Sequence, residues 1–107
     1  MEIKNIEEMK GGWFIGNFNP SVFNTKQFEV GYKVHPKGKA RDKHFHKVAT
    51  EINYLIRGSM KICGKTVVKG QVFTIHPGEI ADADFIEECE WIVVKVPCVP
   101  EDKYYCE

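Results

Sequence analysis

Two histidines and a glutamate within the segment KHFHKVATEINYLIRG (residues 43–58) have the residue types and the spacing of a metal site. Side chains two positions apart on a strand point the same way, so His44 and His46 share one face, about 6–7 Å apart along the chain. Glu51 begins the next alternating strand and can supply a third ligand. Imidazole and carboxylate ligands bind divalent transition metals at about 2.1 Å, so the set predicts a site for Fe, Mn, Ni, Co or Zn. The spacing does not rank these metals.

Two other interpretations of the same histidines stay open. In the first, the two histidines lie on a solvent-exposed face of a strand and bind no ligand. Alternatively, both line a metal-free pocket and move protons, because a neutral imidazole with a pKa of about 6.5 suits proton transfer at neutral pH. Burying three ionisable groups without a metal is costly unless they hydrogen-bond one another, which favours the metal interpretation.

The elements that must position these side chains are strands. Hydrophobic residues alternate with polar ones, or run continuously, in segments bounded by glycine and proline turns, and such patterns are typical of β-structure. The segments are FEVGYKV (28–34), EINYLIRG (51–58), MKI and TVV around the turn CGK (60–68), QVFTI (71–75) and EWIVVKV (90–96). We expect an all-β antiparallel sandwich or barrel. Ile3, Ile6 and Met9 at three-residue spacing predict a short N-terminal arm or helix that ends at Gly11-Gly12.

Length and composition narrow the function classes. We expect one domain over residues 1–107, because a chain of 107 residues is the size of a single compact domain. Lysine plus arginine and aspartate plus glutamate balance at 15 each, which argues against a nucleic-acid binder. The sequence shows neither a membrane span nor a signal peptide, so we expect a cytoplasmic protein that does not bind membranes. The four cysteines form no Cys-x-x-Cys pair, and we expect free thiols.

The frame around the histidines resembles a known family. Gly38, His44, His46, Glu51 and Gly58 follow one another with five, one, four and six intervening residues. This spacing resembles the first motif of the cupin family at all five fixed positions.

The second cupin motif is only partly matched, over residues 70–85. Gly70 and Gly78 fit, but His76 stands at the proline position, Ala81 at the histidine position and Phe85 at the asparagine position. The fourth metal ligand of the family is therefore missing at Ala81. Water or substrate would then complete the site, or a substitute would reach in from Asp82, Asp84 or His76.

The resemblance implies a double-stranded β-helix, a jelly-roll barrel of two antiparallel sheets with its core at about residues 27–97, commonly paired as a homodimer. It implies that His44, His46 and Glu51 face into the barrel together with Asn53, whereas Ile52, Tyr54 and Ile56 pack on the opposite side. His76, at a strand end, is then a candidate to line the barrel mouth. Lys95 lies in a very apolar strand and either reaches an edge or points into the cavity as an anion contact.

We therefore predict a metal-binding small cupin that binds a small polar or anionic molecule such as a sugar, a sugar acid or a nucleotide sugar. The predicted substrate contacts are Asn53, His76 and Lys95. Basic residues concentrate in residues 33–47, and this run either is a solvated face or rims a pocket for an anion. Isomerase, lyase and dioxygenase chemistry are consistent with such a centre. The alternatives are a non-catalytic binding module or, since HFHK is similar to a motif of nucleotide-sugar ketoisomerases, a metal-free enzyme that uses His44 and His46 as acid and base.

Overall fold

The protein is built almost entirely from short antiparallel strands. A computed structural model describes residues 1–40 and 42–106. Two single-turn 3-10 helices open the chain, η1 (Ile6–Glu8) and η2 (Lys10–Gly12). The strands are β1 (Trp13–Ile15), β2 (Glu29–His35), β3 (Gly38–Lys39), β4 (His44–Phe45), β5 (Thr50–Arg57), β6 (Ser59–Ile62), β7 (Lys65–Val68), β8 (Val72–Ile75), β9 (Asp84–Phe85), β10 (Cys89–Val96) and β11 (Tyr104–Tyr105). The all-β prediction and the short N-terminal helix are confirmed.

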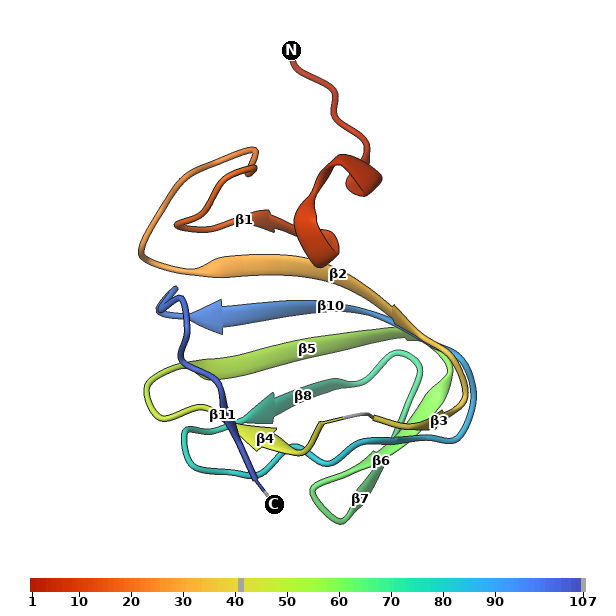
Figure 1. The fold of residues 1–107 in the computed structure, drawn as a ribbon. Helices are drawn as coiled ribbons and strands as arrows, with labels where there is room; N and C mark the ends of the chain where they lie inside the picture. The colour runs from red at the N-terminus through yellow and green to blue at the C-terminus, as the bar shows by residue number, and fades with distance from the viewer. Residues whose placement is uncertain (41, 107) are drawn as a thin grey trace.

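Three sheets enclose the interior. The main sheet has five strands in the order β1-β2-β10-β5-β8, and a second sheet has four in the order β3-β9-β6-β7. Strands β4 and β11 form a separate antiparallel pair. Figure 1 shows the main sheet on one side, with β4, β3, β6 and β7 on the other. The pairs β1-β2 and β4-β11 include residues outside the range 27–97 predicted for the barrel core.

The inward face of the main sheet changes character along its strands. At one end, the cross-strand neighbours Glu29, Lys95 and Glu51 are all charged. At the other, the hydrophobic core packs against the four-stranded sheet, with Leu55, Met60 and Phe85 at 0, 2 and 4% exposure. Because the strands are antiparallel and in register, the charged side chains collect at one end of the interior. The barrel therefore has an apolar end that holds it together and a polar end.

The outward face of the main sheet is apolar. Ile52, Tyr54 and Ile56 point outward, as predicted, and are 38, 47 and 39% exposed. Most of their outward neighbours on the adjacent strands are also hydrophobic, whereas Thr74 lies beside Ile52. We call the following residues the outer face: Val30, Tyr32, Val34, Ile52, Tyr54, Ile56, Val72, Ile92, Val94 and Val96. On β2, whose inward residues are Glu29, Gly31, Lys33 and His35, this inverts the usual pattern, in which the apolar side of a strand faces the interior.

The turn glycines of the two motifs adopt conformations that other residues rarely adopt. Gly58 has a φ of 96°, and a Cβ atom built there would lie 2.3 Å from the main-chain oxygen of Glu88. Only glycine allows β5 and β6 to turn against this neighbouring segment.

The cysteines and the helices bear on two further expectations. All four cysteines are free thiols, as expected, and Cys89 and Cys98 are buried. Within residues 1–40 and 42–106, no helix is long and apolar enough to cross a membrane.

Candidate functional site

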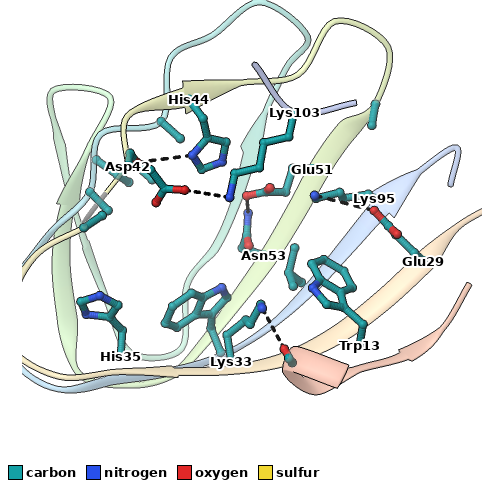
Figure 2. A pocket seen from close by; sticks show the side chains of 18 of the residues that line it. Trp13, Glu29, Lys33, His35, Asp42, His44, Glu51, Asn53, Lys95 and Lys103 are labelled. Carbon is teal, nitrogen blue, oxygen red and sulfur yellow. Dashed lines mark hydrogen bonds and ion pairs between the residues drawn. The ribbon is translucent and has the colours of Figure 1, made fainter. Parts of the chain in front are cut away.

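A pocket of about 1090 Å³ opens into the polar end of the barrel. Its walls come from the inward face of the main sheet, from residues 10–19, from the segment between β2 and β4 and from the C-terminal segment at residues 99–103. Its apolar floor comes from core residues that include Met60, Ile62 and Phe85. Of the predicted site residues, Glu51, Asn53, Lys95 and His44 line it (Figure 2), whereas His46 is not among the lining residues. Cross-strand register explains the first three, because Lys95 pairs with Glu51 and Val93 pairs with Asn53.

His46 and Glu51, two of the three predicted metal ligands, lie together. His46 is 4% exposed, and its Nε2 atom is 3.4 Å from Glu51 Oε1. The Nδ1 atom of His46 donates a hydrogen bond to the main-chain oxygen of Asp102. A neutral imidazole carries one proton, so Nε2 then presents a lone pair to a carboxylate oxygen that also only accepts. Among the described residues this Nε2 atom has no hydrogen-bond partner.

His44, the third predicted ligand, lies beside His46. The ring centroids are 5.3 Å apart, and the planes cross at 74°. Its Nδ1 atom is 3.5 Å from the main-chain oxygen of Asp42. Burial lowers the pKa of His44, and the positive charge of Lys103 lowers it further. The ring is therefore held neutral at neutral pH, with a nitrogen lone pair available.

The donors fit a metal in part. Two ligands at about 2.1 Å from one metal, at angles near 90–110°, are roughly 3.0–3.4 Å apart, and the His46 to Glu51 distance matches this separation. A hydrogen bond from His Nδ1 to a carbonyl is the usual support of a metal-binding imidazole. However, the described residues contain no group of three His, Cys, Asp or Glu side chains arranged to hold a metal ion. The pair fits, whereas the full predicted set is not assembled.

Glu51 is held in its charged form. Burial raises the pKa of this carboxyl. The hydrogen bond from Asn53, the charge of Lys95 and, when Nε2 carries a second proton, a hydrogen bond from His46 outweigh burial, so the pKa lies below its ordinary value. The Nδ2 atom of Asn53 donates a hydrogen bond of 3.1 Å to Glu51 Oε2. The Oδ1 atom of Asn53 has no hydrogen-bond partner among the described residues, although the side chain is 1% exposed.

Asp102 fixes the histidine segment from the far end of the chain. Its carboxylate accepts hydrogen bonds from the backbone N–H groups of Lys47, Val48 and Ala49 at 3.0, 3.1 and 2.9 Å. Burial alone would raise the pKa of Asp102, but these three bonds outweigh it and lower the pKa. The sequence analysis did not identify Asp102, because its partners lie more than 50 residues away and no local pattern marks it.

Other charged side chains at the pocket were also missed. Lys103 pairs with Asp42 at 2.9 Å, and both line the pocket. Lys33 reaches the pocket from β2 (Figure 2). Alternation along the segment FEVGYKV (28–34) places Lys33 on the same face as Glu29. It does not indicate which of the two faces is inward.

The remaining predicted residues lie elsewhere. His76 is exposed and is not among the residues that line the pocket, and its contact with a ligand stays a prediction. Asp82 and Asp84, offered as substitutes for the missing ligand, are exposed as well and do not line it. Ala81 is buried beside His44, to which its backbone is hydrogen-bonded in both directions. The position where the family motif has its histidine is therefore next to His44, but it carries only a methyl group.

Comparisons with known proteins bear on the fold. No protein-family model and no curated protein matches the sequence. Among solved structures, an uncharacterized protein with a double-stranded β-helix domain from Klebsiella pneumoniae is similar over 98% of this chain and 91% of its own, with 17% identity and a TM-score of 0.71. Oxalate decarboxylase from Bacillus subtilis matches 75% of this chain with 18% identity and a TM-score of 0.64, and the match spans 24% of the decarboxylase chain.

A sugar phosphate isomerase from a cupin superfamily, from Silicibacter pomeroyi, is also similar. The match covers 76% of this chain and 57% of the isomerase, with 20% identity and a TM-score of 0.57. Structural matches at such low sequence identity are evidence about the fold and not about the activity. Together with the antiparallel sheets, these matches show that this chain has the cupin fold, the double-stranded β-helix that the resemblance of the first motif implied.

Proposed function

We propose that this small cupin-fold protein binds a small polar or anionic molecule in its barrel, next to a divalent metal held by His46 and Glu51, with His44 beside His46 as the predicted third ligand. One observation carries the metal part. His46 Nε2 and Glu51 Oε1 face each other at 3.4 Å, while His46 Nδ1 is engaged by the carbonyl of Asp102. Two buried acceptors in this position call for a cation between them, and a metal or a second proton on His46 would meet that need.

The pocket's own residues suit a polar ligand. The unpartnered Oδ1 atom of Asn53 can accept a hydrogen bond from a ligand hydroxyl, and Lys95 can pair with an acidic group. A bound metal would act as a Lewis acid or an oxygen-activating centre. Such a site is compatible with isomerase, lyase or dioxygenase chemistry on a sugar, a sugar acid or a nucleotide sugar. Among the similar structures are a sugar phosphate isomerase and an oxalate decarboxylase with Mn(II) centres.

A metal-free function is the second candidate. It is favoured by the absence, among the described residues, of a three-membered ligand group, and by the neutral His44 at the pocket wall. His44 would then act as a general base with Glu51 nearby, as in a ketoisomerase-like reaction, or the pocket would bind its ligand without turning it over.

Metal analysis separates the two candidates. The protein is purified without a histidine tag and without added metal, and its metal content is measured by mass spectrometry for the wild type, Glu51→Gln and Glu7→Gln. Glu7 is an exposed carboxylate in η1 and serves as the matched control. We expect about one equivalent of a transition metal in the wild type and in Glu7→Gln, and its loss in Glu51→Gln. If a folded wild type contains no metal and takes none up on incubation with Mn, Fe, Ni, Co or Zn, the metal proposal is wrong and the second candidate stands.

We also propose that the protein forms a homodimer through its outer face. The central residues of this face carry no charge, and several are well exposed, with Val72 at 64% and Val34 at 50%. A continuous apolar surface on the face of a sheet is typical of a protein contact. A second copy of the same face would place apolar surface against apolar surface, as a two-fold contact requires, with Glu90 beside Val34 at one end of the contact.

A further inference from the structure

Trp13 occupies a defined place in the pocket wall. It lies on β1 opposite Gly31 of β2, and a Cβ atom built on Gly31 would be 2.8 Å from the Cε3 atom of Trp13. The indole ring therefore lies directly against the inward face of β2, where a side chain would otherwise stand. Both Trp13 and Gly31 were outside the predicted site.

Two lysines approach the indole of Trp13. The Nζ atom of Lys33 is 5.0 Å from the ring centroid, and that of Lys95 is 4.9 Å from it. Lys33 follows Gly31 by two residues on β2, and Lys95 pairs with Glu29, which precedes Gly31 by two. The two ammonium groups therefore reach the pocket near one aromatic ring (Figure 2).

The two lysines differ in their acidic partners, because Glu29 and Glu51 act on both but only Lys95 forms an ion pair among the described residues. The Nζ atom of Lys95 forms an ion pair with Glu29 Oε1 at 3.7 Å. The Nζ atom of Lys33 instead donates a hydrogen bond of 2.8 Å to the neutral main-chain oxygen of Gly11. Burial lowers the pKa of Lys33, the positive charges of Lys95 and Lys103 lower it further, and the negative charges of Glu51 and Glu29 offset this only in part. Partly buried cations that repel one another are stabilised when an anion binds between them.

Asn53, which can accept a hydrogen bond, lies in the same cross-strand row of the main sheet as Gly31 and Trp13. Across the strands, Asn53 pairs with Val93, Val93 with Gly31, and Gly31 with Trp13. Asn53 lines the pocket, and its Oδ1 atom has no partner among the described residues. Two strand spacings of about 4.8 Å separate Asn53 from Gly31, so the backbone of Asn53 lies roughly 10 Å from β2. That distance suits one sugar-sized molecule with a hydroxyl at one end and an acidic group at the other.

We propose that Lys33, Lys95 and Trp13 form a subsite for the acidic group, carboxylate or phosphate, of a hydroxylated small molecule whose hydroxyl donates a hydrogen bond to Asn53 Oδ1. This inference rests on the proposed function, since it names the ligand class of the same pocket. The ligand is an acidic monosaccharide derivative. Glu51 is the cross-strand neighbour of Lys95, so the acidic group at this subsite and the metal would bind side by side.

Binding measurements with three probes test the subsite. Isothermal titration is carried out with galacturonate, glucose 6-phosphate and neutral galactose, on protein with its metal content as purified and after saturation with Mn²⁺. We expect the wild type to bind at least one acidic probe about tenfold or more tightly than galactose. The tighter of the two acidic probes identifies the acidic group as carboxylate or phosphate.

Variants locate the effect. Lys33→Met keeps the apolar stem over Trp13 and should weaken binding of the acidic probe about tenfold, whereas Lys33→Arg should retain most of it. Lys65→Met, on the exposed strand β7, is the matched control and should bind like the wild type. Thermal unfolding of each variant verifies the fold.

The outcomes separate the two proposals. If galactose binds as tightly as the acidic probes, or if folded Lys33→Met binds the acidic probe like the wild type, the anionic subsite is wrong while a small-molecule pocket still stands. If none of the three probes binds to the wild type in either metal state, both this inference and the proposed sugar-type ligand are wrong. The metal content of Lys33→Met should equal that of the wild type in every case.

Discussion

Replacing Asp102 by alanine should strongly destabilise the protein, because one buried carboxylate holds the segment that follows His46. The side chain is 6% exposed and accepts three backbone hydrogen bonds, from Lys47, Val48 and Ala49. A hydrogen bond to a charged group contributes about 1.5–3 kcal/mol to stability. Three such bonds would sum to about 4.5–9 kcal/mol, but they share one carboxylate and the freed loop can reach water. We therefore expect a loss of about 3–5 kcal/mol, at or below the lower end of that sum.

Urea unfolding at neutral pH, followed by the fluorescence of Trp13 and Trp91, measures this loss. Asp102→Asn keeps the size and one acceptor oxygen, so it should lose roughly half as much and provides a folded variant if the alanine variant does not fold. Asp82→Ala removes an exposed carboxylate from the same half of the chain and should change stability by less than about 0.5 kcal/mol. A loss of under 1 kcal/mol in Asp102→Ala would refute the argument that this carboxylate holds the histidine segment in place.

Two further predictions concern a turn and the outer face. Gly58→Ala should cost at least about 2 kcal/mol in urea unfolding, because it adds a clash with the main-chain oxygen of Glu88 to the strain of a φ of 96°. Gly70→Ala, with a φ of 87° and no neighbour within 4 Å, carries the strain alone and should cost less, and equal losses would contradict the clash. Tyr54→Lys should convert the proposed dimer to a monomer in light scattering, whereas Thr66→Lys on β7 should not. A wild type with the mass of a monomer at high concentration would rule out the dimer.

Long strands could be predicted because their pattern is local. The alternation from 51 to 58 and the apolar run from 90 to 96 each span enough residues to show a period of two, and both are strands in the structure. Strands β3, β4, β9 and β11 have two residues each, and two residues carry no period. Their existence depends on pairing across the fold, which local sequence does not encode.

The candidate site divides in the same way. The proximity of His46 and Glu51 could be predicted from strand geometry and a short link, since only five positions separate them. The contacts of His46 with Asp102 and of Trp13 with Gly31 join distant parts of the chain or different strands, and neither has a local signal. These contacts decide which nitrogen of His46 faces Glu51 and where the lysines stand.

Lys33 shows why even a correct strand assignment can hide a functional residue. Alternation places it on the polar side of β2, and the ordinary rule assigns the polar side to solvent and the apolar side to the core. In this fold the polar side faces a pocket, and the apolar side, with Val34 at 50% exposure, belongs to the outer face. A sheet can carry this inverted pattern only if something other than its own apolar stripe holds the polar end together. The charged contacts of Asp102 and the pairing of β11 with β4 serve this purpose here, so the polar end should open before the apolar end when the protein is partly destabilised.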